Sequence, residues 1–397
     1  MRRLMVPAGV AMVAVTFGLA RYGYGLLLPD MRADLGIGVG TAGLIGSSAY
    51  VSYLLANAAV VPVTARWGPR VAIAAAALTA SAGMALIAVA GDASQLLAGV
   101  LLAGAAAGFA FPPYADVVAA AVAPARRPAV WAVISSGTGW GVAVAGPVAA
   151  VFTTSWRWSW AMFAGTALVV GALAVASAPG GRVGGGSATV RLHPAWFVCP
   201  RSGPLLAGAV LVGAGSSVWW AFSVDAMRAS GVGAGTAQLV FATCGVAGVL
   251  ASLTGSVVRR TGQRSVHRGS VLALAAALAL LAATTRSDTP PVTALLLAGG
   301  LFGVSYNAVV AVQGMWNADV FRERPSAGLA AVNTALTAGT LVGPAVGGWV
   351  IGVSGYGVAL TLAAGVAGLT VLLAPPASRS DGSTSGQRVG SDQVPVS

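Results

Sequence analysis

Long runs of apolar residues recur along the chain, and each run is long enough to cross a lipid bilayer. A bilayer core of about 30 Å needs about 20 apolar residues in a helix. The runs are continuous rather than alternating in polarity, which predicts helices and not barrel strands. They number twelve and lie near residues 5–28, 41–63, 71–90, 95–119, 129–152, 158–178, 204–224, 235–258, 269–285, 292–316, 327–351 and 356–374. We therefore predict an all-α membrane protein with 12 transmembrane helices.

The composition supports a chain that faces lipid. Only 8% of its residues are charged and 57% are apolar, and the mean hydropathy is +0.83. A soluble protein has about 25% charged residues, so a water-exposed surface cannot be built from this chain. The same values exclude a disordered protein, and two cysteines exclude a disulfide scaffold.

The net charge of +12 comes from arginines that cluster between the apolar runs. They form no continuous patch with interleaved aromatics, so we expect no nucleic-acid partner. Most of them fall in segments that are cytoplasmic if the N-terminus is inside, and positive loops resist translocation. We therefore expect a multi-pass protein of the cytoplasmic membrane with both termini cytoplasmic. The first run has no clean cleavage site, so we expect a retained span and not a secretory signal.

The two halves of the chain repeat each other. MRADLGIGVGTAGLI at 31–45 matches MRASGVGAGTAQLV at 227–240, and RWGPR at 66–70 matches RTGQR at 260–264. Two later pairs, Arg127-Pro128 with Arg324-Pro325 and Gly146-Pro147 with Gly343-Pro344, keep nearly the same spacing. The matches indicate a parallel repeat of two six-helix halves around a midplane site. The predicted parts are listed in chain order: an N-terminal half at 1–178, a cytoplasmic linker at 179–203, a C-terminal half at 204–375 and a disordered tail at 376–397.

These features carry a resemblance to a known family. Six plus six spans, a long middle segment and RxGxR turns resemble the major facilitator superfamily, and FGLARYGYGLLLPDM at 17–31 is similar to the YbfB/YjiJ-like bacterial permeases. The resemblance implies secondary active transport of a small organic solute by alternating access. The family's loop after span two reads GxLaDRxGRR; here Arg66, Gly68 and Arg70 fit, but Ala65 replaces the acid. These residues are candidates for gating, and the alternative is that the arginines only fix the topology.

A glycine and proline pattern in two spans bears on the direction of transport. Span five carries Gly146 and Pro147, and span eleven carries Gly339, Gly343 and Pro344 in a match to GxxxGPxxGG. In the family this pattern, in span five, is associated with antiporters that export their substrates, so the resemblance favours efflux. The alternative is ordinary close packing of helices through small residues.

Arg21 is a cation inside the first span. Such a residue costs about 2.5 to 3.5 kcal/mol on insertion scales, so it normally faces the protein interior or water and marks a site. A wheel of 100° per residue places it on one face with Phe17 and Tyr24. We predict that these three residues bind the substrate. The alternative is that Arg21 reaches the outer interface along its own flexible stem.

Asp116 is the other embedded charge, in span four. A buried acid can carry protons, which makes it the proton-coupling candidate. The alternative is a structural ion pair with Arg126 or Arg127. Tyr114, close to it in the same span, is a further candidate for substrate binding.

Polar and aromatic residues line one face of two spans in the second half. Amides, hydroxyls and large aromatics on such a face can orient a ligand, and the alternative is packing between helices. The predicted substrate-binding residues are Ser216, Trp220 and Ser223 in span seven and Tyr306, Asn307, Gln313 and Asn317 in span ten. Asp225, at the outer end of span seven, is expected to be a solvated cap.

No catalytic motif is present in the sequence. There is no CxxC, HExxH or P-loop, so we predict no enzyme, no metal, no cofactor and no ATP-driven transport. The primary hypothesis is a monomeric, proton-coupled transporter of a small molecule in the lipid bilayer. The alternatives are a passive facilitator or uptake permease of the same fold, and a membrane sensor that binds a ligand without moving it.

Overall fold

The computed structural model describes residues 4–152, 155–178, 199–287 and 289–376. Within these ranges the regular secondary structure is helical throughout. Eleven helices are long and apolar enough to cross a membrane, and a twelfth apolar helix, Tyr356–Leu372, is shorter. The all-α membrane fold is therefore confirmed. The predicted linker at 179–203 and tail at 376–397 lie almost entirely outside the described residues.

The N-terminal half begins with a discontinuous span. In chain order its helices are α1 (Met5–Val13), the π-helix η2 (Ala14–Leu19), α2 (Gly23–Leu35), α3 (Val39–Trp67), α4 (Pro69–Ala88), α5 (Ala93–Ala121), η3 (Pro124–Arg126), α6 (Arg127–Ser135), α7 (Gly137–Val151) and α8 (Trp156–Ser177).

The C-terminal half begins with a continuous helix instead. In chain order its helices are α9 (Ser202–Ala229), α10 (Ala234–Val249), η5 (Leu250–Leu253), α11 (Thr254–Thr261), α12 (Gln263–Thr284), α13 (Val292–Val320), α14 (Pro325–Ser354), α15 (Tyr356–Leu369) and η6 (Thr370–Leu372).

The repeated RxGxR turns have the same backbone geometry in both halves. Gly68 has a φ of 85° between α3 and α4, and Gly262 has a φ of 84° between α11 and α12. Glycine adopts this region at little cost because it has no Cβ. The inner end of the bundle is the end that holds these two turns, and the outer end holds Gly36 and Gly231. Both names follow the predicted orientation.

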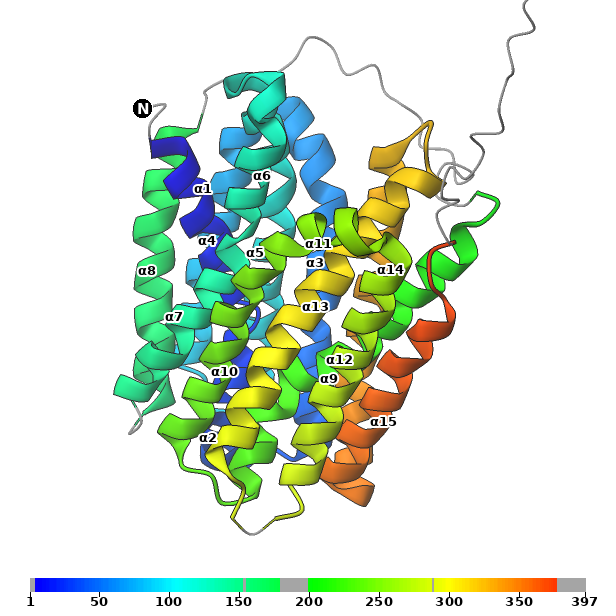
Figure 1. Cartoon of the computed structure of the whole chain (residues 1–397). Coiled ribbons are helices and arrows are strands. Elements are labelled where there is room, and N and C mark those ends of the chain that lie inside the picture. Colours follow the sequence, from blue (N-terminus) through cyan, green and yellow to red (C-terminus); the bar gives the residue numbers. More distant parts are fainter. Residues whose placement is uncertain (1–3, 153–154, 179–198, 288, 377–397) are drawn as a thin grey trace, which may run out of the picture.

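The two halves lie side by side and pack through three helix pairs, α3 with α14, α7 with α10 and α2 with α9 (Figure 1). Small residues bring the backbones together at these contacts. A Cβ added to Gly43 would lie 2.3 Å from the Pro344 carbonyl oxygen, and one added to Gly146 would lie 2.4 Å from that of Gln238. Pro344 and Gly146 therefore belong to the interface between the halves.

Helix α12 starts earlier than the sequence suggests. It begins at Gln263 rather than near 269, so His267 lies within the helix and is fully buried. Its Nε2 is 3.4 Å from the Thr370 carbonyl oxygen, and its ring lies edge-on to Trp316. The hydropathy pattern does not predict the first residues of α12, because they are polar. Polar residues that tertiary contacts bury cannot be told from loop residues by hydropathy alone.

Candidate functional site

The first span changes its helical geometry around Arg21. Ala20 N–H donates to the Val15 carbonyl at 2.9 Å, and Tyr22 N–H donates to the Phe17 carbonyl at 3.1 Å. Both bonds span five residues, and the regular helix resumes only at Gly23. Short π-helical segments of this kind occur frequently at functional sites. The irregular backbone therefore holds Arg21 between two helical segments, near the middle of the span.

Four aromatic rings surround the Arg21 guanidinium, and we call them the Arg21 cage: Phe17, Tyr22, Tyr50 and Tyr53. The guanidinium carbon is 4.5 Å from the ring centres of Tyr50 and Tyr53, 5.6 Å from that of Phe17 and 5.9 Å from that of Tyr22. A cation at these distances is attracted to the ring faces. Arg21 thus points into an aromatic enclosure between α2 and α3.

The guanidinium has no anionic partner among the described residues. Arg21 is partly exposed, but its Nε is buried without a hydrogen-bond partner. The two ion pairs of the described chain lie elsewhere, at Arg32 with Asp225 and at Arg157 with Asp34. Aromatic faces stabilise a cation but accept its hydrogen bonds poorly. The site therefore presents unfilled donors.

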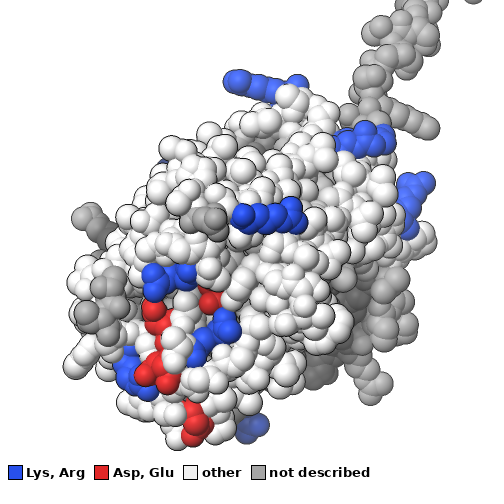
Figure 2. Space-filling view, turned by 90° about the horizontal axis from the view of Figure 1, so that it is seen from below, with Lys and Arg blue, Asp and Glu red and all other residues white. Residues whose placement is uncertain are grey.

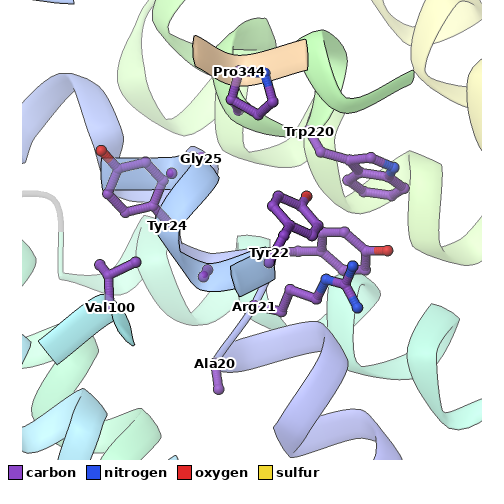
Figure 3. Close-up of a pocket in the computed structure, with 12 residues that line it drawn as sticks. Ala20, Arg21, Tyr22, Tyr24, Gly25, Val100, Trp220 and Pro344 are labelled. Carbon is purple, nitrogen blue, oxygen red and sulfur yellow. The ribbon is translucent and has the colours of Figure 1, made fainter. Parts of the chain in front are cut away.

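The C-terminal half closes the cage with aromatic residues. Trp220 on α9 stacks on Tyr22, with ring centres 4.1 Å apart and planes 26° apart. Tyr306 on α13 lies edge-on to Trp220, with ring centres 5.7 Å apart. A pocket lined by Arg21, Tyr22, Tyr50 and Trp220 has a cavity volume of about 20 Å³, so the site is nearly closed in this state (Figure 3).

A polar contact joins the two halves beside the cage. The Asn333 side chain on α14 donates to the Tyr53 hydroxyl at 2.9 Å. The residues predicted from the sequence do not include Tyr22, Tyr50, Tyr53 or Asn333. Tyr50 and Tyr53 are three residues apart, which puts both rings on one helix face, and that spacing was an available signal.

The structure brings together some of the predicted site residues and separates others. Phe17 lies over Arg21, Trp220 stacks on Tyr22 of the cage, and Tyr306 lies edge-on to Trp220. Tyr24 does not share the face of Arg21, because the break in the span rotates α2 (Figure 3). Its ring lines the same pocket, but its hydroxyl donates to the Ala42 carbonyl at 2.7 Å.

The remaining polar candidates lie in helix packing or in the buried core. Asn307 donates to the Gly303 carbonyl at 2.8 Å, and Asn317 donates to that of Pro325 at 2.9 Å. The Ser216 hydroxyl is 3.4 Å from the Gly213 carbonyl of its own helix. Buried side-chain atoms without a hydrogen-bond partner occur at three further candidates, Tyr114, Ser223 and Gln313. None of these six residues lines the pocket at Arg21.

Asp116 is exposed near the inner end of α5 and has no ion pair among the described residues. The alternative that pairs it with Arg126 or Arg127 is therefore wrong for this structure. Arg127 instead donates to the carbonyls of Val122 and Ala119, at 3.0 and 2.6 Å. These carbonyls at the end of α5 have no partner within the helix, and they bind the Arg127 guanidinium in place of the Asp116 carboxylate.

The gating candidates occupy turns and close helix contacts. Arg66 lies 5.3 Å from the ring centre of Trp67, and Arg66 and Arg70 are both exposed beside the buried turn at Gly68. A Cβ added to Gly339 or Gly343 would lie 2.0 or 1.9 Å from an atom of α9. These glycines therefore bring α14 against α9, inside the C-terminal half. Pro147 is the second residue of the other glycine-proline pair, in α7.

A charged contact links the two halves at the outer end, and we call Arg32, Asp225 and Tyr356 the outer latch. Arg32 Nη1 lies 2.5 Å from Asp225 Oδ2 and donates to the Tyr356 hydroxyl at 3.0 Å, and that hydroxyl donates to Asp225 Oδ2 at 2.6 Å. Asp225 is only 5% exposed, so our expectation of a solvated cap was wrong. Acidic and basic side chains gather on this end (Figure 2).

The comparisons with known proteins agree with this architecture. A profile described as Major Facilitator Superfamily matches residues 10–198 and 204–395. The crystal structure of the nucleoside transporter NupG is similar, with a TM-score of 0.75 and 17% identity over 93% of this chain and 97% of that one. A bacterial homologue of the human lysosomal transporter Spinster, crystallised inward-facing and unoccupied, has a TM-score of 0.74 and 14% identity, covering 94% and 95%.

These likenesses to solved structures show the fold alone, and no curated protein sequence matches the chain. The profile of this transporter family matches nearly all of both halves. The protein is therefore a multi-pass membrane transporter that belongs to the major facilitator superfamily.

Proposed function

We propose that the protein is a secondary active transporter that moves a small organic solute through the Arg21 cage by alternating access. The single observation that carries the proposal is the unpaired Arg21, held at a break in the first span where aromatic residues of both halves meet. A buried cation that only anchored a helix would reach the interface or a carboxylate. This one points into a pocket instead.

The proposed cycle moves the halves 1–178 and 204–375 against each other, joined by the linker 179–203. The outer latch ties α2 to α9 and α15, which supports a state closed at the outer end. Asp116, the proton-coupling candidate, is exposed at the inner side of the same structure. Opening the outer end requires the outer latch to break. The solute binds in the cage between the halves, and its binding favours the conformation in which the solute makes more contacts.

Proton coupling and export are the finer parts of the proposal. Asp116 has no ion pair among the described residues, so it is free to take up a proton as the cycle proceeds. Export is supported by the resemblance of the glycine-proline pattern at Gly339, Gly343 and Pro344 to the pattern associated with exporters. Gly146 and Pro344 lie at the interface between the halves. We further propose that the chain works as a monomer in the cytoplasmic membrane, with both termini cytoplasmic.

The test is transport by the purified protein in liposomes with an imposed pH gradient. A screen for solutes that raise thermal stability supplies the ligand, because binding to the folded state stabilises it. Accumulation against a solute gradient supports coupled transport. Downhill flux alone supports the passive facilitator, and binding without flux in either direction overturns transport and leaves a sensor.

A further inference from the structure

The charge of the central site is fixed and uncompensated. Among the described residues of the spans, the other charged side chains lie toward the ends of their helices, whereas Arg21 lies near the middle of the first span. Arginine stays protonated under all conditions of protein chemistry, so the site cannot lose its charge by releasing a proton. A solute that enters the pocket therefore meets a permanent positive charge.

The cage satisfies the charge of Arg21 but not its hydrogen bonds. Cation and ring contacts are worth about 0.5 to 2 kcal/mol each, which helps to hold the guanidinium away from bulk water. The guanidinium has a fork of N–H donors and no acceptor, and its Nε is buried without a partner. The group that fits this fork is a planar anion with two oxygens, because a carboxylate accepts two parallel N–H bonds from arginine.

The walls of the pocket favour a flat apolar body beside the anion. Tyr22 of the N-terminal half and Trp220 of the C-terminal half stack on each other, with ring centres 4.1 Å apart, and Tyr50 lines the same pocket. When the halves separate, the facing surfaces of Tyr22 and Trp220 become free to hold a flat solute. Tyr306 closes the arrangement edge-on to Trp220. Aromatic side chains pack well on planar unsaturated groups through offset stacking and edge-to-face contacts. The polar and apolar requirements of the site thus point to one kind of molecule.

The geometry points to a small planar organic monoanion, an aromatic or otherwise unsaturated carboxylate, as the substrate class of the Arg21 cage. This inference rests on the proposed function, since it names what the transporter carries. A cationic solute is disfavoured, because it would bring a second positive charge into the cage, where the described part of the chain places no acid between the two charges. A neutral solute leaves the guanidinium without its charged acceptor.

The experiment compares three nearly isosteric probes that differ in charge: benzoate, benzamide and benzamidine. Binding to the purified wild-type protein is measured by isothermal titration calorimetry at fixed pH and salt. We expect benzoate to bind at least about tenfold more tightly than benzamide, and benzamidine not to bind, because like charges repel in a site of low dielectric constant. Equal binding of the three probes, or no binding of benzoate, phenylacetate and 4-hydroxybenzoate, overturns the inference.

Two variants assign the effect to Arg21, and a third is the matched control. Arg21→Gln should abolish the preference for benzoate, whereas Arg21→Lys should keep the order of the probes with weaker benzoate binding. Arg157→Gln removes another arginine that lies over a ring, 4.2 Å from Trp156, but outside the cage, and should bind benzoate like the wild type. Wild-type benzoate binding by a folded Arg21→Gln protein contradicts the inference.

Vesicle uptake separates this inference from the proposed function. If benzoate binds in a way that depends on Arg21 but is not carried across the vesicle membrane, the proposal of transport fails, while the inference of an anion-binding site remains supported. If a neutral or cationic solute is transported equally by the wild type and by Arg21→Gln, transport stands and the anion inference fails.

Discussion

The first and seventh spans of this transporter occupy equivalent places in the two halves, yet they are built differently. The first is interrupted by a π-helical segment and presents an unpaired arginine to an aromatic cage. The seventh is the continuous helix α9, with Ser217 at the position that matches Arg21, and the Ser217 hydroxyl donates to the carbonyl of Ala214 in the same helix. The repeat thus sets the arrangement of the helices, and the proposed binding site lies where the two copies of the repeat differ.

The largest effect is expected from removing the charge in the first span. Arg21→Gln deletes the cation while keeping a polar side chain of similar reach. We expect transport to fall to the level of protein-free liposomes, because the solute loses its charged hydrogen bonds in the pocket. Uptake by reconstituted protein measures this, with gel filtration as the check on folding. Normal uptake would show that Arg21 is only an anchor.

The next effect tests the contact that closes the outer end. Asp225→Asn weakens the outer latch, and losing one partner of a buried charged pair costs about 3 to 5 kcal/mol in general. Ser223 is buried on α9 close to Asp225 in the chain. We therefore expect thiol labelling of Ser223→Cys, in a protein without Cys199 and Cys244, to become at least about tenfold faster in the Asp225→Asn background.

The control for the latch is an ion pair within one half. Arg157 on α8 pairs with Asp34 on α2, and both helices belong to the N-terminal half. Arg157→Gln should leave the labelling rate of Ser223→Cys unchanged. Equal rates in the wild-type and Asp225→Asn backgrounds would remove the latch from the closure of the outer end.

A smaller effect is expected at the inner side. Asp116→Asn removes an acid that can gain and lose a proton, so transport should lose part of its dependence on pH while the maximal rate falls only several-fold. Initial uptake rates between pH 5 and pH 8 measure this. Asp319→Asn is the matched control, since Asp319 is another exposed acid toward the inner end. An unchanged pH profile in Asp116→Asn would exclude Asp116 from proton coupling.

The smallest effect sharpens the comparison between the two spans. Ser217→Ala removes a hydroxyl that donates only within its own helix, and such a bond contributes about 1 kcal/mol. We expect uptake within about twofold of the wild type. A loss of transport as large as that of Arg21→Gln would mean that the seventh span carries the chemistry as well.

The helices could be predicted because lipid leaves the backbone few choices. A segment in the bilayer must satisfy its own N–H and C=O groups, so each long apolar run becomes a helix. The break at Ala20 to Tyr22 could not be predicted, because the wheel assumes a constant 100° per residue and so put Tyr24 beside Arg21. The pairing of Arg32 with Asp225 joins residues 193 positions apart, and only the docking of the halves creates it.

The most direct test of the central claim asks whether the cage opens to both compartments. Tyr50→Cys, in a protein without Cys199 and Cys244, is placed in sealed vesicles and treated with an anionic thiosulfonate reagent that does not cross the membrane. Reagent on either side of the membrane should modify the cysteine, and solute should slow both reactions. Modification from one compartment only, with and without solute, would contradict alternating access through the Arg21 cage.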